Sequence, residues 1–254
     1  GAVRQKHGGV ELMTQLRTSL GCAVRLSRPR SSPVTKQLVV FPHAGGGVAF
    51  YQHWRELLPD EVDLFIMQYP GREEAQSAPA WETAQYAIAR CVDALHASLG
   101  IAPAVIFGHS MGTLLALQVA AALQTSRFRI DTVLSAQRAP SELKLLQQES
   151  QRQKVLDHIL AFSESSGALT LDALTRPLVT RLIQQDLRLL GELSAEPLPG
   201  LQPRIWGGDD DPLVSRSALS QWKKELPGSQ VQLLTGDHFY FMQDTAAFLR
   251  RLLQ

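Results

Sequence analysis

Short apolar runs alternate with helical patterns along most of the chain. Six runs rich in apolar and β-branched residues have the length of buried strands. They lie at residues 38–41, 64–69, 104–107, 132–135, 204–206 and 231–234. Between them the apolar positions predict helices at 51–58, 84–99, 113–123, 216–226 and 245–253. Strands and helices that alternate in this way indicate an α/β fold, with a mostly parallel central sheet and helices on both faces.

One segment, about residues 141–194, departs from this alternation because it contains only helical patterns. Its apolar residues recur three and four positions apart, as Leu156, Ile159 and Leu160 do, which indicates amphipathic helices. The segment lies between two predicted strands, so we interpret it as an inserted helical lid over the active-site edge of the sheet. Extra crossover helices packed on the sheet are the alternative, since the spacing shows that one face is buried without showing against what.

The chain has the length of one large α/β domain. It contains 254 residues, of which 44% are hydrophobic, and such domains often reach about 250 residues. Residues 1–12 lack periodicity and precede Met13, so we expect them to be a remnant of the expression vector. Residues 13–254 are therefore predicted to form a single domain that includes the lid.

Charge and cysteine content narrow the possible functions. The net charge is +1, from 25 basic and 24 acidic residues, and gives no global reason to expect nucleic acid or an anionic membrane as a partner. The longest helical apolar stretch, residues 113–123, is too short to span a bilayer, and residues 1–12 lack the apolar core of a signal peptide. Cys22 and Cys91 form neither a disulfide framework nor a metal-binding spacing. We expect a cytoplasmic monomer with reduced thiols and with no metal or other cofactor.

The most informative motif is Gly-His-Ser-Met-Gly at residues 108–112. It follows the predicted strand 104–107 and precedes a predicted helix, the order of a nucleophile elbow. The glycines suit a turn so tight that side chains near the serine would collide. Such a turn lifts the Ser110 hydroxyl clear of the sheet. It also places the serine at a helix N-terminus, where backbone N–H groups favour developing negative charge. We predict that Ser110 is a catalytic nucleophile.

An acid and a base are expected after the nucleophile, in the order serine, acid, histidine. The loop after the strand 204–206 contains Asp209, Asp210 and Asp211 in succession. We predict Asp211 as the acid, because the following proline favours an extended backbone; Asp209 and Asp210 are the alternatives, interpreted as turn and capping residues. The predicted base is His238, which follows the last strand in a loop and could pass a proton between the serine and the acid.

The glycine-rich loop after the first predicted strand is expected to form the oxyanion hole. It reads Phe-Pro-His-Ala-Gly-Gly-Gly at residues 41–47, and its glycines allow backbone N–H groups to approach a substrate oxygen closely. The predicted donors are the backbone N–H groups of Ala44 and Met111. His43 needs no catalytic role for this, and we expect His109, beside the nucleophile, to serve in packing.

Five motifs together give the chain a resemblance to a known family. They are Phe-Pro-His-Ala-Gly-Gly (41–46), Tyr-Pro-Gly-Arg-Glu (69–73), Gly-His-Ser-Met-Gly (108–112), Gly-Gly-Asp-Asp-Asp-Pro (207–212) and Gly-Asp-His-Phe (236–239). The combination resembles the type II thioesterases, editing hydrolases of non-ribosomal peptide and polyketide biosynthesis. The resemblance implies the α/β-hydrolase fold, a triad of Ser110, Asp211 and His238, and oxyanion donors at Ala44 and Met111. The role of the Pro-Gly-Arg turn at residues 70–72 is not explained by the sequence.

The same resemblance implies an activity and a partner. The implied reaction is hydrolysis of acyl thioesters carried on the phosphopantetheine arm of acyl or peptidyl carrier protein domains, with no cofactor on the enzyme itself. Two alternatives stay open, because the triad alone does not separate a thioester from an oxygen ester. They are a small-molecule carboxylesterase or lipase of the same fold, and a catalytically silent interaction module.

Overall fold

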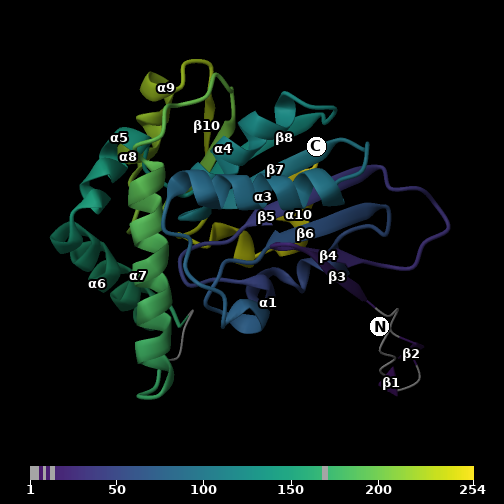
Figure 1. Ribbon diagram of the computed structural model, residues 1–254, viewed down its shortest axis with the longest axis horizontal. Coiled ribbons are helices and arrows are strands. Elements are labelled where there is room, and N and C mark those ends of the chain that lie inside the picture. Colours follow the sequence, from purple (N-terminus) through teal and green to yellow (C-terminus); the bar gives the residue numbers. More distant parts are fainter. Residues whose placement is uncertain (1–5, 8–9, 12–14, 168–170) are drawn as a thin grey trace.

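An eight-stranded, mostly parallel sheet forms the centre of the molecule (Figure 1). The computed structural model describes residues 6–7, 10–11, 15–167 and 171–254. The strand order is β10-β9-β8-β7-β5-β6-β4-β3, and only β4 pairs antiparallel, with β3 and with β6. The strands are β3 (Leu16–Leu20), β4 (Ala23–Ser27), β5 (Lys36–Phe41), β6 (Val62–Met67), β7 (Ala104–His109), β8 (Ile130–Ser135), β9 (Arg204–Gly208) and β10 (Gln230–Leu234). The predicted fold class is confirmed, and each of the six predicted strands is present.

Strands β3 and β4 were not predicted from the sequence. Strand β3 lies at the edge of the sheet, and its residues are exposed or only partly buried, so its sequence Leu-Arg-Thr-Ser-Leu contains no apolar run. Strand β4 is largely buried, but Arg25 interrupts its short apolar stretch and forms an ion pair with Asp63 on β6. Pairing with neighbours makes these segments strands, and their own hydrophobic patterns do not reveal it.

Helices cover both faces of the sheet. Their bounds are α1 (Val48–Tyr51), α2 (Trp54–Leu57), α3 (Ala84–Ser98), α4 (Gly112–Gln124), α5 (Pro140–Leu143), α6 (Glu149–Ser165), α7 (Thr175–Leu193), α8 (Arg216–Ser220), α9 (Trp222–Glu225) and α10 (Thr245–Leu252), with 3₁₀ turns η1 (Glu73–Ala75), η2 (Lys144–Gln147) and η3 (Tyr240–Met242). The helix predicted at 51–58 corresponds to α2 and to Tyr51, the last residue of α1, which begins before the predicted range; the one predicted at 216–226 is divided into α8 and α9. Among the described residues, no helix combines the length and the apolar character needed to cross a membrane.

Strand β5 shows why its sequence is continuously apolar. Val39 and Phe41 face the apolar cluster that contains α3 and α4, whereas Leu38 and Val40 face the cluster that contains α1, α2 and α10. All four side chains are fully buried, because successive residues of a strand point to opposite faces and both faces are covered.

The segment predicted to be a lid forms α5, η2, α6 and α7 between β8 and β9. Figure 1 shows α7 crossing one end of the sheet, with α6 beside it on the outer side. Helix α7 also packs against α3 and α4, so the segment is anchored on the body of the domain as well as lying over the sheet end. Residues 168–170 of the predicted lid lie outside the described residues.

A short antiparallel pair, β1 (Lys6–His7) with β2 (Val10–Glu11), precedes the domain. It forms a two-stranded sheet separate from the central one. It also falls within residues 1–12, for which we expected no structural role; the rest of that stretch and Met13 lie outside the described residues. The interpretation of residues 1–12 as a vector remnant stays a prediction.

Candidate active site

Ser110 occupies a sharp turn between β7 and α4. Its backbone is in the left-handed region, with φ of 55°, and its N–H donates to the Ser135 carbonyl over 2.7 Å. This conformation is strained for a residue with a side chain. A Cβ atom at Gly108 would lie 2.6 Å from the Gly112 oxygen, and one at Gly112 would lie 2.1 Å from the Phe41 oxygen. Close backbone approach therefore requires both glycines of the motif, as the elbow interpretation predicts.

The side chains of Ser110, His238 and Asp211 converge at the carboxyl edge of the sheet. His238 Nε2 lies 3.0 Å from Ser110 Oγ, and His238 Nδ1 lies 2.8 Å from Asp211 Oδ2. The side chains of His238 and Asp211 are 5% and 1% exposed, so water hardly reaches the bond between them. The arrangement can pass a proton from the serine hydroxyl to an imidazole that a carboxylate orients.

The geometry separates the three successive aspartates that the sequence left as alternatives. Asp209 Oδ1 accepts the Gly236 N–H over 3.0 Å, and Asp210 is exposed. Asp211 Oδ1 accepts the N–H groups of Leu213 and Val214, at 2.7 and 3.2 Å, which holds the carboxylate so that Oδ2 faces His238. Of the three, Asp211 is the one in contact with the imidazole.

The backbone N–H groups of Ala44 and Met111 lie beside the nucleophile. Both residues line cavities that also contain Ser110. Within the described residues, neither N–H donates to a protein acceptor, and an oxyanion hole requires donors that are free in this way. Their function as oxyanion donors stays a prediction.

The motif at residues 69–73 is hydrogen-bonded to the glycine-rich loop and to the start of α1. The Tyr69 hydroxyl donates to the Pro42 carbonyl over 2.8 Å. The Glu73 carboxylate accepts the N–H groups of Val48 and Ala49, each at 3.0 Å, at the start of α1. A Cβ at Gly47 would lie 2.7 Å from a Glu73 oxygen, so this glycine makes room for the carboxylate. The sequence alone does not explain the Pro-Gly-Arg turn within this motif, and the contacts of the motif show that it supports the loop.

His109 is buried behind the nucleophile and is connected through Ser135 at the end of β8 to Tyr240 of η3, in keeping with the packing role expected for it. Its Nδ1 lies 2.9 Å from Ser135 Oγ, which in turn lies 2.7 Å from the Tyr240 hydroxyl. The ring centroid of His109 is 5.1 Å from that of His238. Burial lowers the pKa of His109 well below 6.5, so its ring is neutral at pH 7.

His43 is enclosed by aromatic rings at the edge of the same cavity. Its centroid lies 4.6 Å from that of Phe50 and 4.9 Å from that of Phe239, and its Nδ1 is hydrogen-bonded to the Tyr51 hydroxyl at 2.8 Å. Burial lowers the pKa of His43 to about 3, and the nearby His238 and Arg72 side chains act in the same direction. His43 is therefore a neutral wall of the site.

Lowering the pH is expected to destabilise the fold through His43. The pKa is 6.5 for a solvated imidazole and about 3 here, so below pH 6.5 the unfolded chain binds more protons than the folded one. The free energy of unfolding therefore decreases as the pH is lowered, by at most about 1.4 kcal/mol per pH unit for this group. Below about pH 6, the free energy of unfolding measured by urea titration should change less with pH in His43→Phe than in the parent. An equal dependence in both proteins would contradict the neutral burial of His43.

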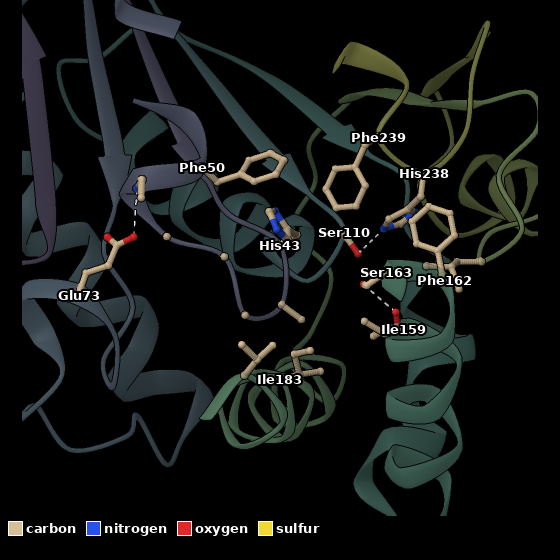
Figure 2. A pocket seen from close by; sticks show the side chains of 17 residues that line it. His43, Phe50, Glu73, Ser110, Ile159, Phe162, Ser163, Ile183, His238 and Phe239 are labelled. Carbon is tan, nitrogen blue, oxygen red and sulfur yellow. Dashed lines mark hydrogen bonds between the residues drawn. The ribbon is translucent and has the colours of Figure 1, made fainter. Parts of the chain in front are cut away.

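Two cavities meet at Ser110. The smaller, of ≈ 390 Å³, runs between the glycine-rich loop and the lid, and its walls include Phe50, Ile159 and Ile183. Figure 2 shows Ser110 and His238 on one side of it and Glu73 on the far side. The larger, of ≈ 750 Å³, lies between α6 and the loops after β8 and β9, and its lining includes the polar side chains of Gln137, Arg138, Gln151, Lys154 and His158. Lid helix α6 therefore borders both cavities.

Comparisons with known proteins agree with this geometry. The family model "Thioesterase domain" matches residues 36–254. Among curated relatives, the AMB antimetabolite synthetase AmbE of Pseudomonas aeruginosa is 28% identical over 243 residues, which are 91% of this chain and 11% of the synthetase. Thioesterase TesA of Mycobacterium marinum is 27% identical over 209 residues, covering 80% of this chain and 84% of TesA.

A comparison with solved structures also identifies a thioesterase. The RedJ thioesterase from the prodiginine biosynthetic pathway of Streptomyces coelicolor superposes with a TM-score of 0.69 at 26% identity, covering 89% of this chain and 90% of RedJ. The chain spans only 11 to 15% of the length of the large synthetases among its curated relatives, in contrast to its near-complete overlap with RedJ.

Proposed function

The chain belongs to the thioesterase domain family, and we propose that it is a type II, editing thioesterase. Its substrates would be acyl groups bound as thioesters to the phosphopantetheine arm of acyl or peptidyl carrier protein domains. The observation that carries this proposal is the hydrogen-bonded series Ser110–His238–Asp211, placed where two cavities meet beneath a helical lid. The likeness to TesA and RedJ supports it, since both are named thioesterases and the match covers 84% and 90% of their lengths.

The geometry supports a two-step acyl transfer. Ser110 Oγ attacks the thioester carbonyl carbon while His238 Nε2 accepts the hydroxyl proton. The tetrahedral oxyanion is stabilised by the N–H groups of Ala44 and Met111. The C–S bond breaks, the thiol leaves with the proton from His238, and Ser110 holds the acyl group. Water then attacks this ester with His238 as the base, which releases the carboxylic acid and restores the serine.

The two cavities suit the two parts of the substrate. The smaller is lined mainly by apolar side chains, such as Ile159, Phe162 and Ile183, and would hold the acyl chain. The larger combines apolar walls with amide and charged side chains, including Gln137 and Lys154, and would hold the amide-rich, phosphate-bearing arm. Arg138 also lines it and is paired with Glu142 over 3.4 Å, which leaves Lys154 as the cation for the phosphate. The scissile carbonyl would then lie at Ser110, where the cavities join.

A substrate panel with matched acyl groups tests this function. The same acyl chain is presented on a phosphopantetheinylated carrier protein, on free coenzyme A and as a p-nitrophenyl ester. We expect a larger kcat/KM for the carrier-bound and coenzyme A thioesters than for the aryl ester, because both thioesters carry the phosphopantetheine arm that would fill the larger cavity. The carrier-bound thioester should be the better of the two, because the carrier protein adds contacts outside the cavities. Faster turnover of the aryl ester would instead assign the protein to the small-molecule carboxylesterases. Failure of a fluorophosphonate probe to label Ser110 would make it a catalytically silent module.

A further inference from the structure

A buried ion pair joins the turn at residues 70–72 to the lid. Arg72 and Asp186 lie 114 residues apart in the chain and are 5% and 4% exposed. Arg72 Nη1 donates to Asp186 Oδ2 and Arg72 Nη2 to Asp186 Oδ1, each over 2.7 Å, so the pair is bidentate. Asp186 belongs to lid helix α7, whereas Arg72 follows β6 in the body of the domain.

The same two side chains bond to the glycine-rich loop. Asp186 Oδ2 accepts the Gly45 N–H over 2.8 Å, and Arg72 Nη1 donates to the Gly46 carbonyl over 3.1 Å. Gly45 has φ of 79° and a Cβ there would lie 3.0 Å from Ile183 of α7, so the loop and the lid helix touch at this residue. The ion pair therefore bonds to the backbone of Gly45 and of Gly46, the two residues that follow Ala44.

These bonds determine the direction of the Ala44 N–H. The Gly46 N–H donates to the His43 carbonyl over 2.9 Å, closing a turn over residues 43–46. The His43 carbonyl and the Ala44 N–H share one trans peptide plane and point in opposite directions. Holding Gly45 and Gly46 in place keeps that turn closed, and the closed turn fixes the plane that carries the Ala44 N–H.

We propose that Arg72 and Asp186 are positioning residues, which set the oxyanion hole and make its geometry depend on the placement of lid helix α7. This inference rests on the proposed function, because it assigns the Ala44 N–H to the oxyanion. A buried ion pair is seldom more stabilising than apolar residues of similar volume, so stability alone does not account for it. Two hydrogen bonds join Arg72 to Asp186, and two more join these side chains to the glycine-rich loop. Orienting one peptide group of this loop for catalysis explains why the buried pair is present.

The double variant Arg72→Met/Asp186→Leu separates positioning from stability. Both charges are removed together, so no unpaired charge is left buried, and the fold is expected to persist. The Tm should fall moderately, because the Gly45 N–H and the carbonyls of Gly46 and Pro70 lose their partners. The rate at which a fluorophosphonate labels Ser110 is expected to fall about 10- to 100-fold, because the developing phosphonyl oxyanion uses the same N–H donors. The kcat for thioester hydrolysis should fall by a similar factor, with KM changed less than about threefold.

A second ion pair, far from the active site, provides the matched control. Asp63 is 3% exposed and pairs with Arg25 over 2.6 Å and with the partly exposed Arg30 over 3.3 Å, near the opposite end of the sheet from the elbow. Arg25→Met/Asp63→Leu is expected to label at the rate of the parent. A folded Arg72→Met/Asp186→Leu protein that labels within about twofold of the parent would overturn the proposal.

If the double variant does not fold, the rate at which a fluorophosphonate labels Ser110 in Arg72→Lys tests the positioning role instead. Lysine keeps the charge, but its single Nζ does not reproduce the planar fork that reaches both carboxylate oxygens and the Gly46 carbonyl. Slower labelling supports positioning, and unchanged labelling refutes it. Fluorophosphonate labelling needs no thioester, so this result is obtained even if carrier-bound substrates prove inactive and the proposed function fails.

Discussion

Thioester turnover by the Ser110→Ala variant is expected to fall about 10⁶-fold, because the triad acts as a unit and loses its nucleophile. The hydroxyl lies 3.0 Å from His238 Nε2, and alanine removes both the attacking atom and the proton that His238 accepts. Labelling by a fluorophosphonate should disappear completely. The fold should persist, because a Cβ is already tolerated at this strained position and the hydroxyl is hydrogen-bonded to His238, a residue of the site.

A second serine in the same cavity provides the control for Ser110. Ser163 on α6 lines the smaller cavity, and its hydroxyl donates to the Ile159 carbonyl over 2.8 Å within the helix (Figure 2). Ser163→Ala is expected to keep turnover within about threefold of the parent, because it removes no reacting group. Labelling that persists in Ser110→Ala and disappears in Ser163→Ala would move the nucleophile to the lid and refute the elbow interpretation.

Turnover by Asp211→Asn is expected to fall about 10⁴-fold through a change of tautomer at His238. Asparagine keeps an oxygen that can accept the N–H groups of Leu213 and Val214, so the loop should hold its shape. The amide NH₂ then faces His238 Nδ1 and makes that nitrogen an acceptor. The proton moves to Nε2, which points at the Ser110 hydroxyl and can no longer accept its proton.

The neighbouring aspartates are the controls for Asp211. Asp210→Asn changes an exposed side chain, and we expect kcat within about twofold of the parent. Asp209→Asn keeps an oxygen for the Gly236 N–H and should be similarly mild. A loss of about 10⁴-fold in Asp210→Asn, with Asp211→Asn active, would transfer the role of the acid to Asp210. Steady-state kinetics at several pH values separate these outcomes from a simple shift of the pH optimum.

The Arg72–Asp186 pair explains why two distant motifs occur together. The loop at residues 41–46 contains Ala44, the proposed oxyanion donor, and the motif at residues 69–73 supports this loop and the start of α1 through Tyr69, Arg72 and Glu73. A lid helix that moved away would take Asp186 from the Gly45 N–H. In our proposal the oxyanion hole is complete only when α7 is in place, which would couple closure of the lid to acyl transfer.

The local sequence determined the fold class and the candidate nucleophile. Strands such as β5 are buried on both faces, so their apolar runs are visible without a partner. The elbow is likewise local, because its glycines and its place between strand and helix follow from backbone sterics. The order of serine, acid and histidine along the chain was sufficient to select Ser110 and His238 as candidates.

Other features of the fold and of the site were decided only by tertiary packing. Edge strand β3 exists because β4 pairs with it, and three adjacent aspartates were separated only by which carboxylate reaches His238. The bond between Arg72 and Asp186 joins residues 114 positions apart, and the lowered pKa of His43 depends on the rings that enclose it. Hydrophobic period and turn chemistry report on neighbours in the chain, whereas contacts between distant residues arise only when the elements that carry them are packed together.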